Sequence, residues 1–479
     1  MKIIVVGCGK IGYTVAKALS EKKGMRVTVI DNNQNIFDSP AEPLDVIFIV
    51  GNGVNEKTLI EAGAKDADLI VSTTNADELN VLTCIMAKHL GTKNTAATVS
   101  DPNYILEFNK LWADLGIDMV INPERQTARE ISRLLRYPTA DGLDTFMDGR
   151  IELVSLKVDD APDYFLGKTV SDVFNKKIDV LLVAIEKESR SVIPHEDTVF
   201  EQSDVIRILG RPSQIMEFLA YLDQMPKKQD VMVIGGSTIT HYLVELLNRH
   251  AVKTNIKIIE KDQSKCEALC ATLSLAENDR RCMFIHGDGA NEDLLTAENI
   301  DQMDAFICLT DSDEENTIIS LYALRSGVKK VITKVNHIHQ NMIKNLGLGL
   351  DNIITPQNIT VNVVNQHVDR LAGVVGSNVR TMHRIFAGDD GNVNAIEFNV
   401  NQKAKCLDVP MRDLKMKEGV VIGCISKGSD IIIPSGETQI QLGDRVIIIS
   451  KNNDIRSLDD IFTNKTTLSA DMPKTESKE

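Results

Sequence analysis

The chain has 479 residues, a net charge of −15, a hydrophobic fraction of 43% and a charged fraction of 25%, which is ordinary for a globular protein of roughly three or four domains. It has no run of Lys and Arg, which argues against a nucleic-acid partner but not against a membrane protein with basic cytoplasmic loops. No apolar segment approaches the roughly 18 residues that cross a bilayer, and because a strand-like run starts at Ile3 we expect no signal peptide. The eight cysteines are scattered without a CxxC pair, so we expect reduced thiols, no metal site and a cytoplasmic protein.

The first 31 residues form the most informative stretch. Ile3–Val6 is an apolar run typical of a buried strand, and it leads into a GxGxxG motif at Gly7–Gly12. A helical pattern follows, and then a second apolar run, Val27–Ile30, ends on Asp31. This order, with the acidic residue about 20 positions after the glycines, predicts a dinucleotide-binding Rossmann unit.

Each residue type has a physical role in such a unit. Gly7 permits the tight turn, Gly9 lets the backbone approach a pyrophosphate, and Gly12 lets the helix pack closely on the strand. The helix N-terminus attracts phosphates, and Asp31 favours a free ribose 2′-hydroxyl, so we expect NAD rather than NADP. The alternative is a Rossmann scaffold with an empty site.

Further strand-like and helix-like segments alternate after Asp31. This alternation predicts an α/β fold with a doubly wound parallel sheet. The predicted strands are Val46–Val50, Leu69–Ser72, Ala96–Val99 and Asp118–Ile121, and the predicted helices are Glu56–Ala62, Asp77–Leu90 and Pro123–Leu135.

The same order of segments returns after Asp230, at a near-constant spacing of about 230 positions. The peptide that starts at Thr74 (TNADELN) recurs at Thr310 (TDSDEEN), which indicates a tandem duplication. The other corresponding positions are Gly7 and Gly235, Asp31 and Glu260, Gly51 and Gly287, and Pro123 and Pro356.

A smaller α+β unit follows each Rossmann unit, and the polar end of the chain is predicted to be disordered. The predicted strands of these small units are Arg150–Leu156, Val180–Ile185 and Val205–Leu209 in one, and Asn394–Phe398, Val420–Ile425 and Arg445–Ile449 in the other. The predicted domains are 1–139 (Rossmann, nucleotide-binding), 140–225 (small unit), 226–372 (Rossmann-like), 373–463 (small unit) and a tail, 464–479.

The second Rossmann unit has a degenerate glycine motif. The turn glycine is kept at Gly235, but Ser237 and Thr240 replace the close-approach and packing glycines. Both hydroxyls still have hydrogen bonds to donate, and Glu260 preserves the ribose acceptor. Two possibilities stay open for this site: a nucleotide site with altered preference, or a vestigial one.

No catalytic constellation is apparent in the sequence. His195 follows a proline in a predicted turn, and its counterpart after Pro434 is Ser435, so the repeat does not keep it. Asp77-Glu78 and Asp313–Glu315 are expected to place negative charge at helix N-termini rather than to bind a metal. An NAD-dependent oxidoreductase remains the alternative for an enzyme.

The motifs together resemble the RCK (regulator of potassium conductance, KTN) family, and two copies in one chain resemble the TrkA family of regulatory subunits of Trk-type potassium uptake systems. The resemblance implies no catalysis but a gating ring, which is a homotetramer at the inner face of the plasma membrane that controls a membrane potassium-translocating subunit. It implies NAD(H) as the ligand, with ATP and ADP as further ligands of the family. The implied first site comprises Gly7, Cys8, Gly9, Lys10, Ile11, Gly12, Asp31, Thr73 and Thr74. The implied second site comprises Gly235, Gly236, Ser237, Thr238, Ile239, Glu260, Thr310, Asp311 and Lys334.

Two departures from the family pattern concern the first site. The position after the fifth strand, where the family often has arginine, is Thr98, whereas the second half has Lys334. The connection Asn32–Pro43 is shorter than the family's usual helix.

We also expect the apolar stripes after Pro123 and Pro356 either to pack in their own unit or to cross to the neighbouring Rossmann unit. A regulator of another cation transporter, such as a potassium/proton antiporter, remains possible.

Overall fold

The structure is a computed structural model. It describes residues 1–34, 44–102, 104, 111–137, 142–174, 179–187, 190–224, 228–248, 253–273, 281–335, 348–350, 352–371, 379–388, 391–400, 404, 406–428, 430–451, 455 and 457–463. The chain divides into two compact units, Met1–Pro138 with Pro226–Ala372, and Thr139–Met225 with Gly373–Glu479. The first unit thus contains both Rossmann-like sheets and the second contains both small sheets. The limits of the four predicted domains stay a prediction, and the predicted tail, 464–479, lies outside the described residues.

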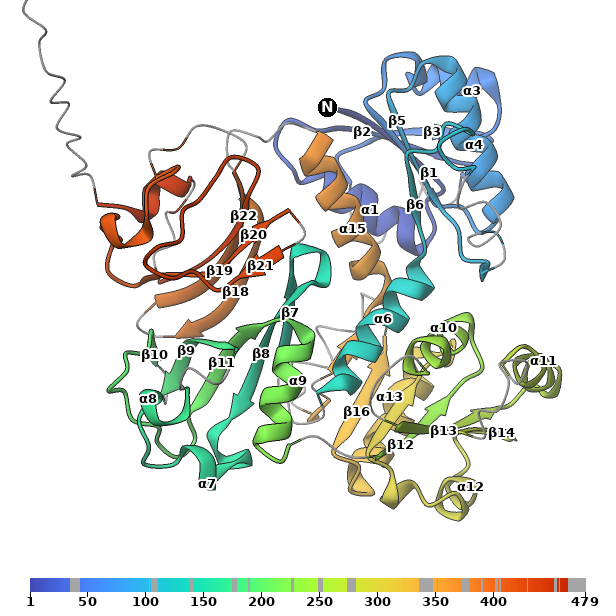
Figure 1. Ribbon diagram of the computed structural model, residues 1–479. Coiled ribbons are helices and arrows are strands. Elements are labelled where there is room, and N and C mark those ends of the chain that lie inside the picture. Colours follow the sequence, from blue (N-terminus) through green and yellow to red (C-terminus); the bar gives the residue numbers. More distant parts are fainter. Residues whose placement is uncertain are drawn as a thin grey trace, which may run out of the picture. The chain divides into compact units, whose positions relative to one another are not determined.

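The first half of the first unit is built on a six-stranded parallel sheet, in the order β3-β2-β1-β4-β5-β6 (Figure 1). This is the strand order of doubly wound nucleotide-binding sheets, so the predicted fold class is confirmed. Strands β1 and β4 lie centrally, which explains their continuous apolar runs. The strands are β1 Lys2–Val6, β2 Arg26–Asp31, β3 Ile47–Val50, β4 Leu69–Ser72, β5 Asn94–Thr98 and β6 Met119–Ile121, and the helices are α1 Lys10–Ser20, α3 Glu56–Glu61, α4 Asp77–Leu90 and α6 Pro123–Arg136.

The second half repeats this plan in the order β14-β13-β12-β15-β16-β17, again entirely parallel. The predicted duplication therefore extends to the topology of the sheet. The strands are β12 Lys228–Ile234, β13 Lys253–Glu260, β14 Cys282–His286, β15 Ala305–Cys308, β16 Lys330–Lys334 and β17 Asn352–Ile354, and the helices are α10 Thr238–Leu247, α11 Gln263–Leu273, α12 Glu292–Ala297, α13 Asp313–Arg325 and α15 Pro356–Leu371.

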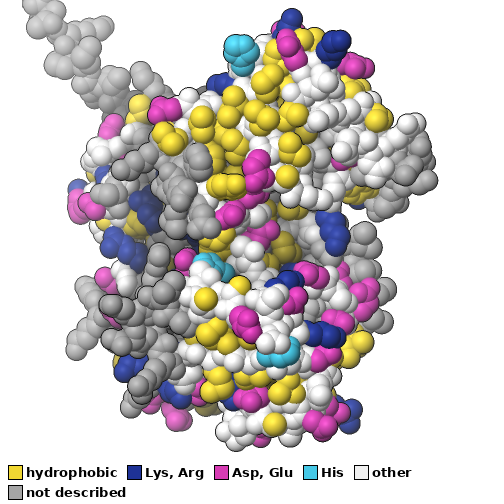
Figure 2. All heavy atoms as spheres, turned by 90° about the vertical axis from the view of Figure 1, so that its right-hand side faces the viewer, with side chains coloured by type: hydrophobic (Ala, Val, Ile, Leu, Met, Phe, Trp, Pro, Cys, Tyr) yellow, Lys and Arg dark blue, Asp and Glu magenta, His cyan; other side chains and the backbone are white. Residues whose placement is uncertain are grey.

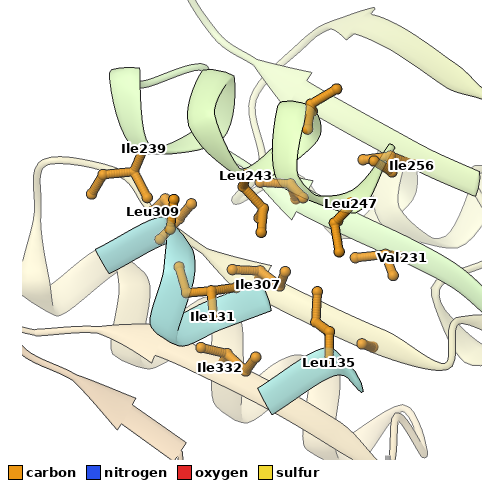
Figure 3. Packing of buried hydrophobic residues seen from close by; sticks show 14 of the residues in the cluster. Ile131, Leu135, Val231, Ile239, Leu243, Leu247, Ile256, Ile307, Leu309 and Ile332 are labelled. Atoms are coloured by element: carbon orange, nitrogen blue, oxygen red, sulfur yellow. The ribbon is translucent and has the colours of Figure 1, made fainter. Parts of the chain in front are cut away.

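The two halves exchange their last helices. Helix α6, which starts after the side-chain cap of Asn122, buries Ile131 and Leu135 in the core of the second half, against α10 and strands β12 and β15 (Figure 3). Helix α15 in turn buries Val364 and Val368 in the core of the first half, against α1. Of the two alternatives for these apolar stripes, packing on the neighbouring Rossmann unit is confirmed.

The second unit contains two antiparallel five-stranded sheets with equivalent orders, β10-β9-β11-β8-β7 and β18-β19-β22-β20-β21. They share one core, in which Leu153 and Leu209 of one sheet pack with Ile447 and Ile449 of the other. Strands β7 and β18 were not among the predicted ones. The elements are β7 Gly142–Phe146, β8 Ile151–Lys157, α7 Pro162–Phe165, α8 Val170–Val173, β9 Leu181–Lys187, β10 Arg190–Val192, β11 Val205–Gly210, α9 Pro212–Tyr221, β18 Val379–Gly388, β19 Gly391–Asn399, β20 Val420–Lys427, β21 Asp430–Ile432 and β22 Arg445–Ser450.

Short 3₁₀ turns complete the described elements, namely η1 Ala64–Asp66, η2 Met147–Gly149, η3 Val158–Asp160, η4 Ile300–Gln302, η5 Met411–Asp413 and η6 Leu458–Ile461. None of the helices in the described ranges combines the length and apolar character needed to cross a membrane. On the face drawn in Figure 2, Lys and Arg side chains of the described residues are interspersed with acidic and hydrophobic ones.

Candidate nucleotide site

The first glycine turn connects β1 to α1, and its shape depends on two positions that have no side chain. Gly7 has a φ of +89°, and a Cβ there would lie 2.9 Å from the backbone of Thr73. A Cβ on Gly12 would overlap the carbonyl oxygen of Gly7, so the helix packs on the turn as predicted. Gly9 differs, because a Cβ there would have only the side chain of Asn75 at 4.0 Å. The backbone at Gly9 is therefore open to close approach.

The carboxylate of Asp31 holds this turn from the end of β2. One oxygen accepts a hydrogen bond from the backbone N–H of Cys8 at 2.6 Å, and the other accepts one from Asn33 at 2.8 Å. Two carboxylate oxygens have about four acceptor positions, so two backbone bonds leave capacity for a ribose hydroxyl. Burial, together with the charge of Asp31, raises the pKa of the Cys8 thiol to about 11. The Cys8 thiol is therefore neutral, and Cys8 contributes to the turn through its backbone N–H.

The end of β4 forms the other wall of the turn. The hydroxyl of Thr73 donates to the carbonyl oxygen of Gly7 at 3.0 Å, and the N–H of Thr73 donates to that of Val6 at 2.7 Å. The next residue, Thr74, is fixed by a buried amide, Asn80 on α4. The Asn80 oxygen accepts from the N–H and the hydroxyl of Thr74, both at 2.7 Å, and its nitrogen donates to the carbonyl of Thr98 at 3.0 Å.

The second half repeats this amide at Asn316. Its oxygen accepts from the N–H and hydroxyl of Thr310 at 2.9 and 2.7 Å, and its nitrogen donates to the carbonyl of Lys334 at 3.0 Å. The sequence prediction did not include Asn80 or Asn316 in either site. Each is the last residue of the repeated seven-residue peptide, so the repeat itself indicated that these two positions share a role.

The second glycine turn reaches a similar geometry with other residues. Gly235 has a φ of +102°, and a Cβ there would meet the backbone at Leu309, which occupies the place of Thr73. Leu309 has no hydroxyl to offer, and the hydroxyl of Thr240 on α10 donates to the Gly235 carbonyl at 2.6 Å instead. The residue that replaces the packing glycine thus supplies the bond that Thr73 makes in the first half.

Glu260 corresponds to Asp31 in geometry as well as in sequence. One of its oxygens accepts from the N–H of Gly236 at 2.5 Å and the other from that of Asp262 at 2.8 Å. A pocket of about 120 Å³ lies beside Glu260 and includes Gly235, Gly236, Ser237, Thr310 and Asp311 in its lining. Six of the nine predicted residues of the second half therefore surround this pocket, whose described lining does not include Thr238, Ile239 or Lys334.

A larger cavity of about 1620 Å³ lies between the two Rossmann halves. From the first half it is lined by Gly9, Lys10, Ile11, Thr73 and Thr74, and from the second by Gly236, Ser237, Thr238, Ile239 and Lys334. Gly7, Cys8, Gly12 and Asp31 are the predicted first-site residues that, in the described part of the chain, frame the turn without lining this cavity.

The cavity brings cationic groups of both halves together. Lys334 is largely buried, and its ammonium group lies 3.8 Å from the carboxylate of Asp311. Burial lowers the pKa of Lys334, and the positive charge of Lys10 from the other half lowers it further. Thr98, at the equivalent position of the first half, also lines the cavity, but it is mostly buried and its hydroxyl accepts a hydrogen bond from Asn80.

Glu124, in the first turn of α6, is an unpredicted member of the cavity lining. One of its carboxylate oxygens is buried without a hydrogen-bond partner, and burial raises the pKa of the group. Its counterpart in α15 is Gln357, an amide. The residue directly follows Pro123 in the sequence, and this position gave no signal of burial.

Other chemical candidates do not form a centre. His195 is exposed in its turn, where its backbone N–H donates to the Thr198 hydroxyl at 2.9 Å. Asp77 and Asp313 each begin a helix, as predicted. Over the residues that the structure describes, no three His, Cys, Asp or Glu side chains gather in a way that would hold a metal ion. Most of the short connection Asn32–Pro43 lies outside the described residues.

Comparison with known proteins places these features in one family. The TrkA-N domain model matches residues 3–123 and 231–356, and the TrkA-C domain model matches 153–223 and 395–463. The chain is 30% identical over 460 residues to the Trk system potassium uptake protein TrkA homolog 1 of Methanosarcina mazei, covering 94% of this chain and 97% of that protein. It is 29% identical to the Trk system potassium uptake protein TrkA of Vibrio alginolyticus, covering 94% and 96%.

The fold is also similar to that of a solved channel. The structure of the GsuK channel bound to NAD matches with a TM-score of 0.59 and 19% identity, covering 94% of this chain and 77% of that chain. The curated relatives are named as parts of a potassium uptake system and not as enzymes. With both domain types matched twice and in alternation, the chain belongs to the TrkA family of Trk system potassium uptake proteins.

Proposed function

We propose that this protein is the regulatory subunit of a Trk-type potassium uptake system and that it controls a membrane potassium-translocating subunit according to bound NAD(H) or adenine nucleotide. The observation that carries this proposal is the open glycine turn at Gly9 beside Asp31, framed by side chains that hold its shape. The names of the curated relatives supply the transport system. The NAD-bound channel with a similar fold makes NAD the first ligand to test.

The proposed sites are the eighteen residues predicted from the sequence, with Asn80 and Asn316 added as positioning residues. In the first site the pyrophosphate lies against Gly9 and the α1 N-terminus, and Asp31 receives the ribose. In the second site Glu260 has the same position, so a nucleotide with altered preference is favoured over a vestigial pocket. No residue is assigned a catalytic role.

The proposed regulation uses the exchanged helices. A ligand shifts a conformational equilibrium only through its different affinities for the two states. Since α6 and α15 each pack on the opposite half, a nucleotide that changes one half also acts on a helix covalently joined to the other. We further propose a homotetramer in the cytoplasm, held at the inner face of the membrane by its potassium-translocating partner.

The test is calorimetric titration with NADH, NAD⁺, ATP and ADP. We expect saturable binding of at least NADH without its consumption. The substitution Gly9→Glu should abolish first-site binding, because it places a carboxylate in the phosphate position and has room to do so. It is a cleaner change than Asp31→Ala, which would also remove two backbone hydrogen bonds.

The matched control is Ser237→Glu, the equivalent change in the second half, which should spare first-site binding. Sustained turnover of NADH with a small carbonyl compound, or NADH binding unaffected by Gly9→Glu, would contradict the proposal. Capture of a Trk-type membrane subunit from native membranes, followed by nucleotide-dependent potassium flux in vesicles, tests the partner.

A further inference from the structure

Tyr242 is a second-half residue that reaches the first half. It lies on α10, the helix that starts at the second glycine turn, and its side chain is 4% exposed. Its ring belongs to the core that contains Ala128 and Ile131 of α6. The ring therefore packs exactly where the exchanged helix enters the second half.

The phenol group makes polar contacts only with first-half groups among its described hydrogen bonds. Its hydroxyl donates to the carbonyl oxygen of Ser100 at 3.2 Å and accepts from the amide nitrogen of Asn122 at 2.9 Å. Asn122 is the N-cap of α6 and accepts from the N–H of Arg125 at 2.6 Å. Burial raises the pKa of Tyr242 to about 12, so the phenol keeps the proton that it donates.

The contact continues to the first nucleotide site. The N–H groups of Ser100 and Asp101 both donate to the same carboxylate oxygen of Asp77, at 2.9 Å each. Asp77 begins α4, directly after the strand-end loop that carries Thr73 and Thr74. Two hydrogen bonds in series, through the backbone of Ser100, thus connect the helix of the second glycine turn to Asp77, which directly follows the loop of the first site.

The pseudo-symmetric junction differs. Thr14 occupies the place of Tyr242 in α1, and its hydroxyl donates to Lys10 within the same helix at 2.7 Å. Thr355 occupies the place of Asn122, and its hydroxyl oxygen is buried without a partner. In the described residues, this polar connection is therefore present at one of the two junctions.

We propose that Tyr242 is a positioning residue that couples the two nucleotide sites: occupation of the second glycine turn orders the Ser100–Asp77 contact and with it the strand-end loop of the first site. This inference rests on the proposed function and deepens it. The coupling is located at one junction, so it does not need a symmetric response of the two halves.

The experiment measures hydrogen exchange at the Ser100 and Asp101 amides, which report on the contact with Asp77. The full chain carries Gly9→Glu, which closes the first site, and ADP or NADH is added as the probe of the second. We expect the better-binding probe to slow exchange at these amides by about 5-fold or more, and the effect to fall below about 2-fold when Tyr242→Phe is added.

Tyr242→Phe keeps the ring in the core and removes only the hydroxyl, and Thr14→Val is the matched control, which should leave the slowing intact. Slowing that persists in Tyr242→Phe would overturn the inference. So would its absence in the parent chain, or the lack of any probe binding to the second half. First-site NADH binding to the unsubstituted chain is measured separately, so failure of the coupling and failure of the proposed function are distinguishable.

Discussion

The two glycine turns of this chain solve the same geometric problem with different residues. In the first, glycine at position 12 leaves room, and Thr73 from the strand end bonds the turn carbonyl. In the second, Leu309 stands at the strand end, and Thr240 from the helix makes that bond. Loss of a motif glycine is therefore not the same as loss of the turn, because what the fold requires is a donor for one carbonyl oxygen.

The largest effect is expected where the halves exchange helices. Ile131→Ala leaves a cavity in the core of the second half and should lower the free energy of unfolding by about 3 kcal/mol. Urea unfolding measures this loss, and hydrogen exchange should show it first in the strands of the second half. The matched change Val364→Ala, which removes one carbon atom fewer, should cost less and speed hydrogen exchange in the first half instead. The exchange of helices would be contradicted if Ile131→Ala raised hydrogen exchange first in the first half, or Val364→Ala first in the second half.

The two buried amides offer the next test. Asn80→Ala leaves the polar groups of Thr74 and Thr98 unpaired and should cost about 2 kcal/mol. It should also weaken first-site NADH binding by about 10-fold, because Thr74 in the strand-end loop loses the hydrogen bonds that hold it in place. Asn316→Ala is the control with a similar loss of stability and unchanged first-site affinity. Equal weakening by both, measured calorimetrically, would show that the amides act only through general stability.

A transplant between the halves tests the comparison of the turns directly. Gly12→Thr alone overlaps the Gly7 carbonyl and the Thr73 hydroxyl, so it should lower the free energy of unfolding by about 2 kcal/mol. Adding Thr73→Leu recreates the second-half pair and should recover part of this loss. A double-mutant cycle with no recovery would mean that the two arrangements are not interchangeable.

The smallest effect concerns Glu124 and its amide counterpart Gln357. Because burial raises the pKa of Glu124 in the folded state, the group stabilises the fold most when protonated, and this contribution is lost as the pH rises above about 4.5. Glu124→Gln should therefore be stabilising at pH 7 and nearly neutral at pH 4. Urea midpoints at the two pH values measure the difference, and a larger gain at pH 4 would have the wrong sign.

The order of strands and helices in both Rossmann halves followed from the sequence, because Ile3–Val6 and its equivalents are apolar runs bounded by glycine. The stripe of Ile131 and Leu135 revealed an apolar helix face but not its neighbour, since periodicity identifies a buried side and not what covers it. Strand β7 (GLDTF) has too few apolar residues to stand out. The role of Thr240 depends on Leu309, which lies nearly 70 positions away, and no local pattern connects the two.

The exchange of helices also affects how the chain folds while it is being synthesised. The apolar face of α1 that contacts α15 has been synthesised once the ribosome passes Ser20. Helix α15, which covers this face, starts only at Pro356. At roughly 5–20 residues per second, a ribosome needs on the order of 20–70 seconds to make the intervening chain. During that time a nascent first half presents an uncovered apolar surface, for which a chaperone or the same half of another nascent chain competes.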